Sequence, residues 1–140
     1  MYLLDTNVVS ELRKAKRGLA DERVVRWAMQ TNAKSLFLSV ITILELETGV
    51  FQMERKDPLQ GQVLRLWLED KVKRAFSGRI LAVDEAVASQ CARLHVPDRR
   101  PDADALIAAT AIVHGFRLVT RNVDDFQGIP VPVVNPWDAA

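Results

Sequence analysis

The chain has few of the residues from which small proteins build cross-links and zinc sites. Its 140 residues include one cysteine and two histidines, too few for an intrachain disulfide or a structural zinc site. Six glycines and six prolines form no linker or low-complexity segment. No apolar run is long enough to span a membrane, so we expect no membrane contact. Disulfide scaffolds, zinc fingers and membrane proteins are therefore excluded as classes.

The N-terminus also lacks a targeting signal. An acid stands at Asp5, and no basic stretch followed by an apolar stretch precedes it, so we expect a cytoplasmic protein. The length fits one domain spanning residues 1–140. Cys91 lies in an apolar helical pattern, which indicates packing in a core rather than chemistry.

Charge is balanced overall but unevenly distributed. The formal net charge is +1, and basic clusters precede Ile80 while acids dominate after it. The basic clusters are Arg13, Lys14, Lys16 and Arg17, followed by Lys71, Lys73 and Arg74. An acidic site beside basic surface suits a phosphate substrate that arrives with metal ions. Solvated helix faces are the other interpretation of the basic clusters.

Strand and helix patterns alternate along the chain. Short apolar runs predict strands at residues 2–4, 36–39, 79–83, 117–120 and 131–134. The first predicted helix is capped by Thr6 or Asn7. The others begin after Asp21, at Thr42, at Pro58 (running to about Phe76), after Asp84 and at Asp102 (ending at Gly115). This alternation predicts an α/β sandwich with a mostly parallel central sheet flanked by helices.

Acids lie where a parallel sheet gathers its functional sites, at the carboxyl ends of strands. Asp5 follows the first predicted strand, and Asn122, Asp124 and Asp125 follow the fourth. Asp5 has an alternative role as a helix cap. An ordinary polar turn explains the other three equally well, and for Asp124 we prefer that explanation.

Two further acids lie near the starts of predicted helices. Glu45 and Thr42 match a capping box, although Glu45 is also placed close to an apolar helix face. Asp102 fits the cap of its helix, which leaves Asp104 available for another role. Taken together, Asp5, Glu45 and Asp104 predict a carboxylate cluster whose repulsion a hard cation relieves. Oxygen-only ligands favour Mg²⁺, with Mn²⁺ as a substitute.

At this point the chain resembles a known family. Five segments carry the match, in order: LLDTNVVSE (residues 3–11), SVITILELETG (39–49), DALIAATA (104–111), TRNVDDF (120–126) and VNPW (134–137). They resemble the PIN-domain family, specifically the VapC-type toxins in the subgroup that includes the FitB proteins. The resemblance implies a PIN-like three-layer sandwich and a metal-dependent endoribonuclease. It also implies a homodimer and a cognate VapB- or FitA-like antitoxin, joined as a heterotetramer or larger assembly.

The resemblance further assigns roles to individual residues. Asp5, Glu45 and Asp104 match the family's metal-binding acids. Many relatives have an acid where this chain has Asn122, so Asp125 is a plausible substitute. Supporting polar positions match Thr6, Asn7 and Thr120, and we expect Arg121 and Arg13, with the cluster up to Arg17, to contact RNA. Because Asn122 departs from the pattern, a non-catalytic module that binds RNA or antitoxin remains the alternative, beside a nuclease acting on DNA or structured RNA.

Overall fold

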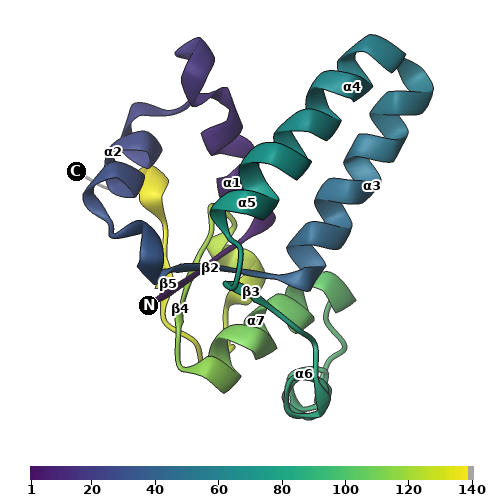
Figure 1. Cartoon of the computed structure of the whole chain (residues 1–140). Helices are drawn as coiled ribbons and strands as arrows, with labels where there is room; N and C mark the ends of the chain where they lie inside the picture. The colour runs from purple at the N-terminus through teal and green to yellow at the C-terminus, as the bar shows by residue number, and fades with distance from the viewer. Residues whose placement is uncertain (139–140) are drawn as a thin grey trace.

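Five parallel strands form one sheet at the centre of the protein. The computed structural model describes residues 1–138, so the last two residues of the predicted domain lie outside the described part. The strands are β1 (Tyr2–Leu4), β2 (Leu36–Ser39), β3 (Ile80–Leu81), β4 (Arg117–Val119) and β5 (Val133–Val134). Their order is β3-β2-β1-β4-β5, and every neighbouring pair is parallel. β1 therefore lies between β2 and β4. Figure 1 shows the sheet at the centre of the molecule, with helices around it.

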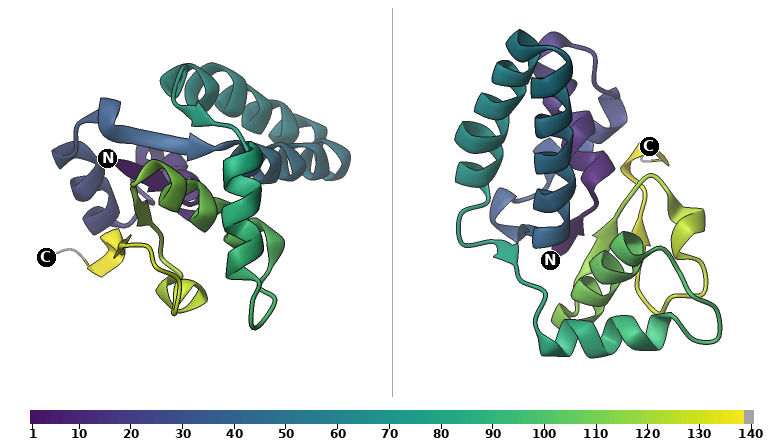
Figure 2. Two further views of the ribbon diagram at one scale, coloured as in Figure 1. Left: turned by 90° about the horizontal axis from the view of Figure 1, so that it is seen from below. Right: turned by 90° about the vertical axis from the view of Figure 1, so that its right-hand side faces the viewer.

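Helices cover both faces of this sheet. They are α1 (Thr6–Arg13), η1 (Lys14–Arg17), α2 (Glu22–Gln30), η2 (Ala33–Ser35), α3 (Val40–Lys56), α4 (Pro58–Leu66), the π-helix η3 (Trp67–Val72), α5 (Lys73–Ala75), α6 (Glu85–Leu94), α7 (Asp102–His114), η4 (Val123–Phe126) and η5 (Pro136–Asp138). Helices α6 and α7 pack on one face, and α1, α2, α3 and η3 pack on the other (Figure 2).

Side-chain alternation along the strands divides the apolar residues into two cores. Leu3 and Leu118 face α6 and α7, whereas their neighbours Leu4 and Val119 face α1 and α3. Successive side chains of a strand point to opposite faces, so a strand buried on both sides is apolar throughout. The predicted three-layer sandwich with a parallel sheet is confirmed.

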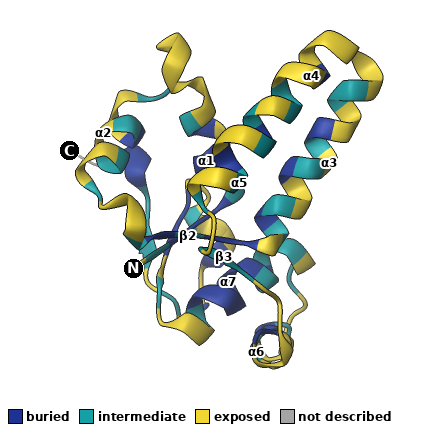
Figure 3. Cartoon of the chain, in the orientation of Figure 1, coloured by how far each residue is buried: buried dark blue, intermediate teal, exposed yellow. Residues whose placement is uncertain are grey.

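Helices α3 and α4 form a long antiparallel hairpin that projects from the sheet (Figure 1), with an exposed tip (Figure 3). Their close approach depends on Gly61, because a Cβ there would lie 2.7 Å from the Glu54 nitrogen and even closer to its Cα. Arg65 joins the two arms through Glu47 at 2.6 Å and Glu54 at 3.1 Å.

Several predicted helix starts are confirmed and others are wrong. Asp21 and Asp84 cap α2 and α6 through their side chains, as predicted. Helix α3 begins at Val40, because the Ser39 hydroxyl accepts a hydrogen bond from the Ile41 N–H. Thr42 therefore lies inside the helix, and the predicted capping box with Glu45 does not form.

Three further boundaries differ from prediction. Asp102 is the first residue of α7 rather than its cap, since Pro101 holds that position without a side-chain hydrogen bond. The helix predicted from Pro58 to about Phe76 contains the π-helical stretch η3. The strand predicted over residues 79–83 pairs with β2 only at Ile80 and Leu81. Cys91 is buried, as predicted, and no helix among residues 1–138 is long and apolar enough to cross a membrane.

Candidate metal centre

Asp5 lies at the carboxyl end of the central strand β1. It is 6% exposed, and its backbone N–H bonds the Val119 carbonyl, which fixes it beside β4. Its Oδ1 accepts a hydrogen bond from the Thr6 N–H at 2.8 Å. Its Oδ2 accepts one from the Thr120 hydroxyl at 2.8 Å and a longer one from the Asn7 amide at 3.4 Å. Asp5, and not the predicted Thr6 or Asn7, is therefore the cap of α1. It is also a buried carboxylate held in one orientation.

Burial raises the pKa of the Asp5 carboxyl above its ordinary value. Hydrogen bonds from Thr120 and Thr6 oppose this rise, and the negative charges of Glu45 and Asp125 add to it. A buried carboxylate favours its neutral form unless a positive charge compensates it. The Asp5 environment is therefore one that a cation would stabilise.

Thr6 connects Asp5 to Glu45. While the Thr6 N–H bonds Asp5, the Thr6 hydroxyl donates to Glu45 Oε1 at 2.6 Å. The hydroxyl of the fully buried Thr42 lies 3.0 Å from that of Thr6. The Thr6 hydroxyl has one proton, which it donates to Glu45. The Thr42 hydroxyl is therefore the donor of the hydrogen bond between the two threonines. Glu45 lies between the buried Thr42 and Leu46 along the helix, near the apolar face as predicted, but its side chain is exposed.

Asp104 reaches the same region from the other face of the sheet. It lies in the first turn of α7 and is half-buried. Desolvation raises the pKa of its carboxyl, and the charges of Asp5, Asp125 and Glu45 raise it further. The four carboxylates therefore share one electrostatic environment, although they come from the end of β1 and from α3, α7 and η4.

Two residues, Asn122 and Asp125, are candidates for the fourth position of the site. The Asn122 N–H bonds the Thr120 hydroxyl at 3.1 Å, but the Asn122 side chain is exposed and makes no cap bond. Asp125 is exposed too, yet its charge acts on both Asp5 and Asp104. Both line a shallow hollow that adjoins Arg121.

The donor chemistry of this cluster fits a hard cation, but it is not a closed cage. Within residues 1–138, no three Asp, Glu, His or Cys side chains converge tightly enough to enclose an ion. Mg²⁺ commonly binds through one or two carboxylates and keeps several waters, so an open cluster suits it better than a zinc or calcium cage. Burial raises the pKa of the Asp5 and Asp104 carboxyls, so a cation beside them would relieve the largest desolvation penalties in the cluster.

A cleft of about 640 Å³ opens beside the cluster, and both predicted RNA-contacting arginines line it. The Arg13 guanidinium carbon lies 5.7 Å from the centre of the Trp67 ring, and that of Arg121 lies 5.3 Å from Trp137. Thr6, Asn7 and Glu45 also line this cleft, which we call the site cleft. The two tryptophans were missed at the sequence level, because only the fold brings them under these arginines.

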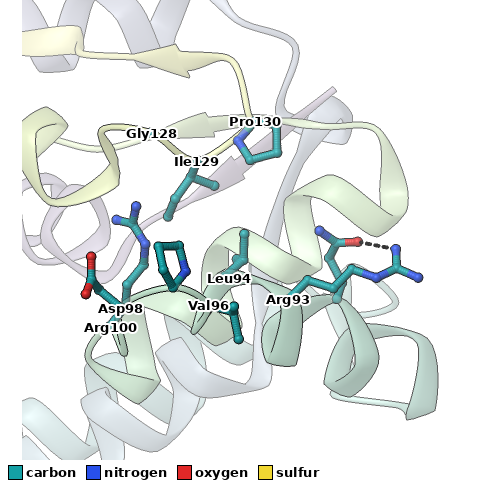
Figure 4. A pocket seen from close by; sticks show the side chains of 10 residues that line it. Arg93, Leu94, Val96, Asp98, Arg100, Gly128, Ile129 and Pro130 are labelled. Carbon is teal, nitrogen blue, oxygen red and sulfur yellow. Dashed lines mark hydrogen bonds between the residues drawn. The ribbon is translucent and has the colours of Figure 1, made fainter.

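A separate hollow of about 620 Å³ lies between α6 and the loop before β5 (Figure 4). Leu94, Val96 and Ile129 surround it with Arg93 and Arg100. None of the predicted site residues lines it, so it is distinct from the candidate metal centre.

Comparison with known proteins agrees with this geometry. The PIN domain family matches residues 2–131. The VapC ribonuclease Y4jK of Sinorhizobium fredii is 35% identical over 100% of both chains. The toxin FitB of Neisseria gonorrhoeae is 38% identical over 98% of this chain and 99% of FitB. The FitAcB crystal structure from that organism gives a TM-score of 0.88 at 37% identity, covering 99% of each chain.

A toxin–antitoxin complex from Klebsiella pneumoniae shares the fold more distantly. Its TM-score is 0.70 at 27% identity, with 97% of this chain and 98% of that chain covered. The chain therefore belongs to the PIN-domain family, within the VapC-type group that includes FitB.

Proposed function

We propose that the protein is a Mg²⁺-dependent endoribonuclease and the toxin of a toxin–antitoxin pair. One observation carries the proposal: the buried Asp5 carboxylate is fixed by Thr6 and Thr120 where the charges of Glu45, Asp104 and Asp125 meet. Relatives named as a VapC ribonuclease and a toxin, each matched over nearly the whole chain, support the activity and the class.

In this proposal Asp5 and Asp104 hold Mg²⁺ directly, and Glu45 binds through oxygen or water. Mn²⁺ is a substitute. When bound, the ion supplies charge stabilisation at the phosphate and a more acidic water. Thr6 and Thr120 orient the Asp5 carboxylate, while Asn7 bridges Thr120 and the Arg121 N–H. Asp125, with Asn122 beside it, adds negative charge at the fourth position, and Arg121 and Arg13 neutralise the RNA backbone.

The test is cleavage of a mixed RNA substrate by purified protein with Mg²⁺ or Mn²⁺. EDTA and Asp5→Ala are expected to abolish cleavage. Asp124→Asn is the matched control, because Asp124 is an exposed acid of the same turn and is expected to retain activity. Cleavage that persists in Asp5→Ala would refute the assignment of the site.

A substrate panel separates the alternatives. Single-stranded RNA, structured RNA and DNA are compared at the same Mg²⁺ concentration, and we expect the fastest cleavage for single-stranded RNA. Cleavage of DNA alone would move the protein to another nuclease class. RNA binding without cleavage under any divalent metal would leave a non-catalytic binding module.

The same proposal includes two kinds of partner. A second copy of this chain forms a homodimer, and a VapB- or FitA-like antitoxin covers the active site in a heterotetramer or larger complex. Likeness to a solved toxin–antitoxin complex supports the antitoxin. Light scattering of the purified chain tests the dimer. Co-expression with the product of a small neighbouring reading frame tests the antitoxin, and that complex is expected to lose RNA cleavage.

A further inference from the structure

A second cleft adjoins the site cleft and has a larger excess of positive charge in its lining. It measures about 530 Å³ and lies between the end of α1 with η1 and the helices α4 and η3. Arg13, Lys16, Arg17 and Lys71 line it, and Asp70 is the one acid in its lining; we call it the basic cleft. Arg13, Lys14 and Trp67 line both clefts, so the two are continuous at these residues.

The positive charges of the basic cleft are not neutralised inside the protein. Lys14 pairs with Glu11 at 2.8 Å, but no ion pair among residues 1–138 includes Arg13, Lys16, Arg17 or Lys71. Lys73 of the same basic sequence cluster differs, because it pairs with Glu47 and Glu69. Four unpaired cations around one hollow attract a polyanion. The interpretation of the basic clusters as solvated helix faces explains neither the paired Lys73 nor these four residues.

The residues shared by the two clefts form a flat platform. Arg13 is exposed and lies over Trp67, which is half-buried against the core around Val72 and Leu68. A guanidinium held by an indole keeps its charge and also offers a planar surface. Nucleobases stack on arginine planes and aromatic rings, so this pair is suited to carry one base.

The basic cleft also contains apolar side chains that no other part of the described chain covers. Leu19 is 65% exposed, Val63 50% and Leu66 53%. Apolar side chains within a ring of cations match a strand that places phosphates outward and base faces inward. An acidic, apolar peptide has similar chemistry, but a phosphodiester strand also matches the planar Arg13–Trp67 pair, on which a base can stack.

We propose that the basic cleft binds the substrate strand on one side of the cleavage position, with one nucleobase stacked on the Arg13–Trp67 pair. This inference rests on the ribonuclease function proposed above. The strand passes from the cluster around Asp5 over Arg13 and Trp67, and its flanking phosphates then meet Lys16, Arg17 and Lys71. Trp67 and Arg13 thereby become specificity-determining residues for the base at that position.

The first experiment measures charge. Lys16→Gln combined with Lys71→Gln is compared with Lys56→Gln, an exposed lysine at the end of α3, using an RNA oligonucleotide at several salt concentrations. The double variant is expected to raise KM several-fold and to reduce the salt slope of binding by about 0.7 for each lost phosphate contact. Lys56→Gln is expected to match the wild type. Equal salt slopes in all three proteins would overturn the proposal.

The second experiment measures stacking and does not depend on catalysis. RNA binding is followed in EDTA by tryptophan fluorescence in a Trp27→Phe background, since Trp27 packs on Tyr2 and lines neither cleft. Trp67→Leu is expected to weaken binding about tenfold, and Trp67→Phe to restore most of it. Arg13→Lys keeps the positive charge but loses the planar guanidinium, so its RNA affinity is expected to lie between those of the wild type and Trp67→Leu.

The outcomes separate this proposal from the nuclease function. RNA that binds in EDTA with this variant pattern but is never cleaved supports the cleft and refutes the nuclease. RNA that is cleaved by wild type with no change of KM or binding in these variants refutes the cleft alone. Binding of poly-glutamate instead of RNA, lost in the lysine double variant, would overturn the proposal in favour of a protein partner.

Discussion

Asp104 contributes to the site at a cost to the stability of the metal-free protein. Its carboxyl pKa is raised by burial and by Asp5, Asp125 and Glu45, so the folded state binds its proton more tightly than the unfolded state does. The stability of the metal-free protein therefore falls as pH rises from the ordinary pKa through the raised one.

Asp104→Asn is accordingly expected to raise the melting temperature in EDTA at pH 7, with a smaller gain at pH 4. The same variant is expected to lose Mg²⁺-dependent stabilisation and RNA cleavage. Differential scanning calorimetry at the two pH values measures the effect, with Asp124→Asn as the unchanged control. A lower melting temperature in EDTA would show that Asp104 stabilises the fold instead.

Thr42 acts on Glu45 only through Thr6. Removing its buried hydroxyl by Thr42→Val keeps the shape but frees the Thr6 hydroxyl to turn away from Glu45. Because partners that orient a metal ligand affect affinity and activity about 10–100-fold, we expect about a tenfold loss of cleavage at low Mg²⁺. Thr42→Ser is expected to restore activity.

The measurement is the Mg²⁺ concentration for half-maximal cleavage, alongside unfolding in urea. A role limited to packing would lower stability without changing the Mg²⁺ requirement. In that case the chain of hydroxyls from Thr42 to Glu45 would have no part in metal binding.

At the scale of the elements, the α3–α4 hairpin depends on one glycine. Gly61→Ala places a Cβ against the Glu54 backbone and is expected to destabilise the protein by about 1–3 kcal/mol, the usual range for overpacking. Gly49→Ala is the matched control, because a Cβ at Gly49 meets nothing within 4 Å. Alanine favours a helix over glycine, so this variant is expected to gain up to about 1 kcal/mol.

Urea unfolding compares the two variants, and hydrogen exchange localises the change. Exchange is expected to increase in α3 and α4 for Gly61→Ala, while the sheet stays protected. Equal changes in the free energy of unfolding for Gly61→Ala and Gly49→Ala would mean that α3 and α4 can move apart without a loss of stability.

At the scale of the whole molecule, the proposed Mg²⁺ site joins the sheet to one of its helical layers. The proposed ligands are Asp5 at the end of β1 and Asp104 in α7, and binding stabilises only the folded state. At a Mg²⁺ concentration of about 100 times Kd, we expect about 2.7 kcal/mol of additional stability. The melting temperature with Mg²⁺, with NaCl of equal ionic strength and with Asp5→Ala tests this. An unchanged melting temperature would argue against a formed metal site.

Much of this molecule follows from local sequence patterns. Apolar runs such as Tyr2–Leu4 are extended because both sheet faces are buried, and the alternation of strands with helices requires parallel pairing. Asp21 and Asp84 have the right side chain just before a helix, so their capping could be predicted. Asp5 directly after an apolar strand similarly indicated a site at the carboxyl edge.

Other features depend on contacts between distant segments. Ser39 rather than Thr42 caps α3 because β2 ends at Ser39, and this places Thr42 inside the helix. Order along the chain does not determine that β1 lies between β2 and β4, and this order alone brings Asp5, Glu45 and Thr120 together. The sequence by itself determined the strands, the helices and the acids. Only the tertiary structure decided that Thr6 joins two carboxylates and that Trp67 lies beneath Arg13, because both require residues far apart in sequence to meet.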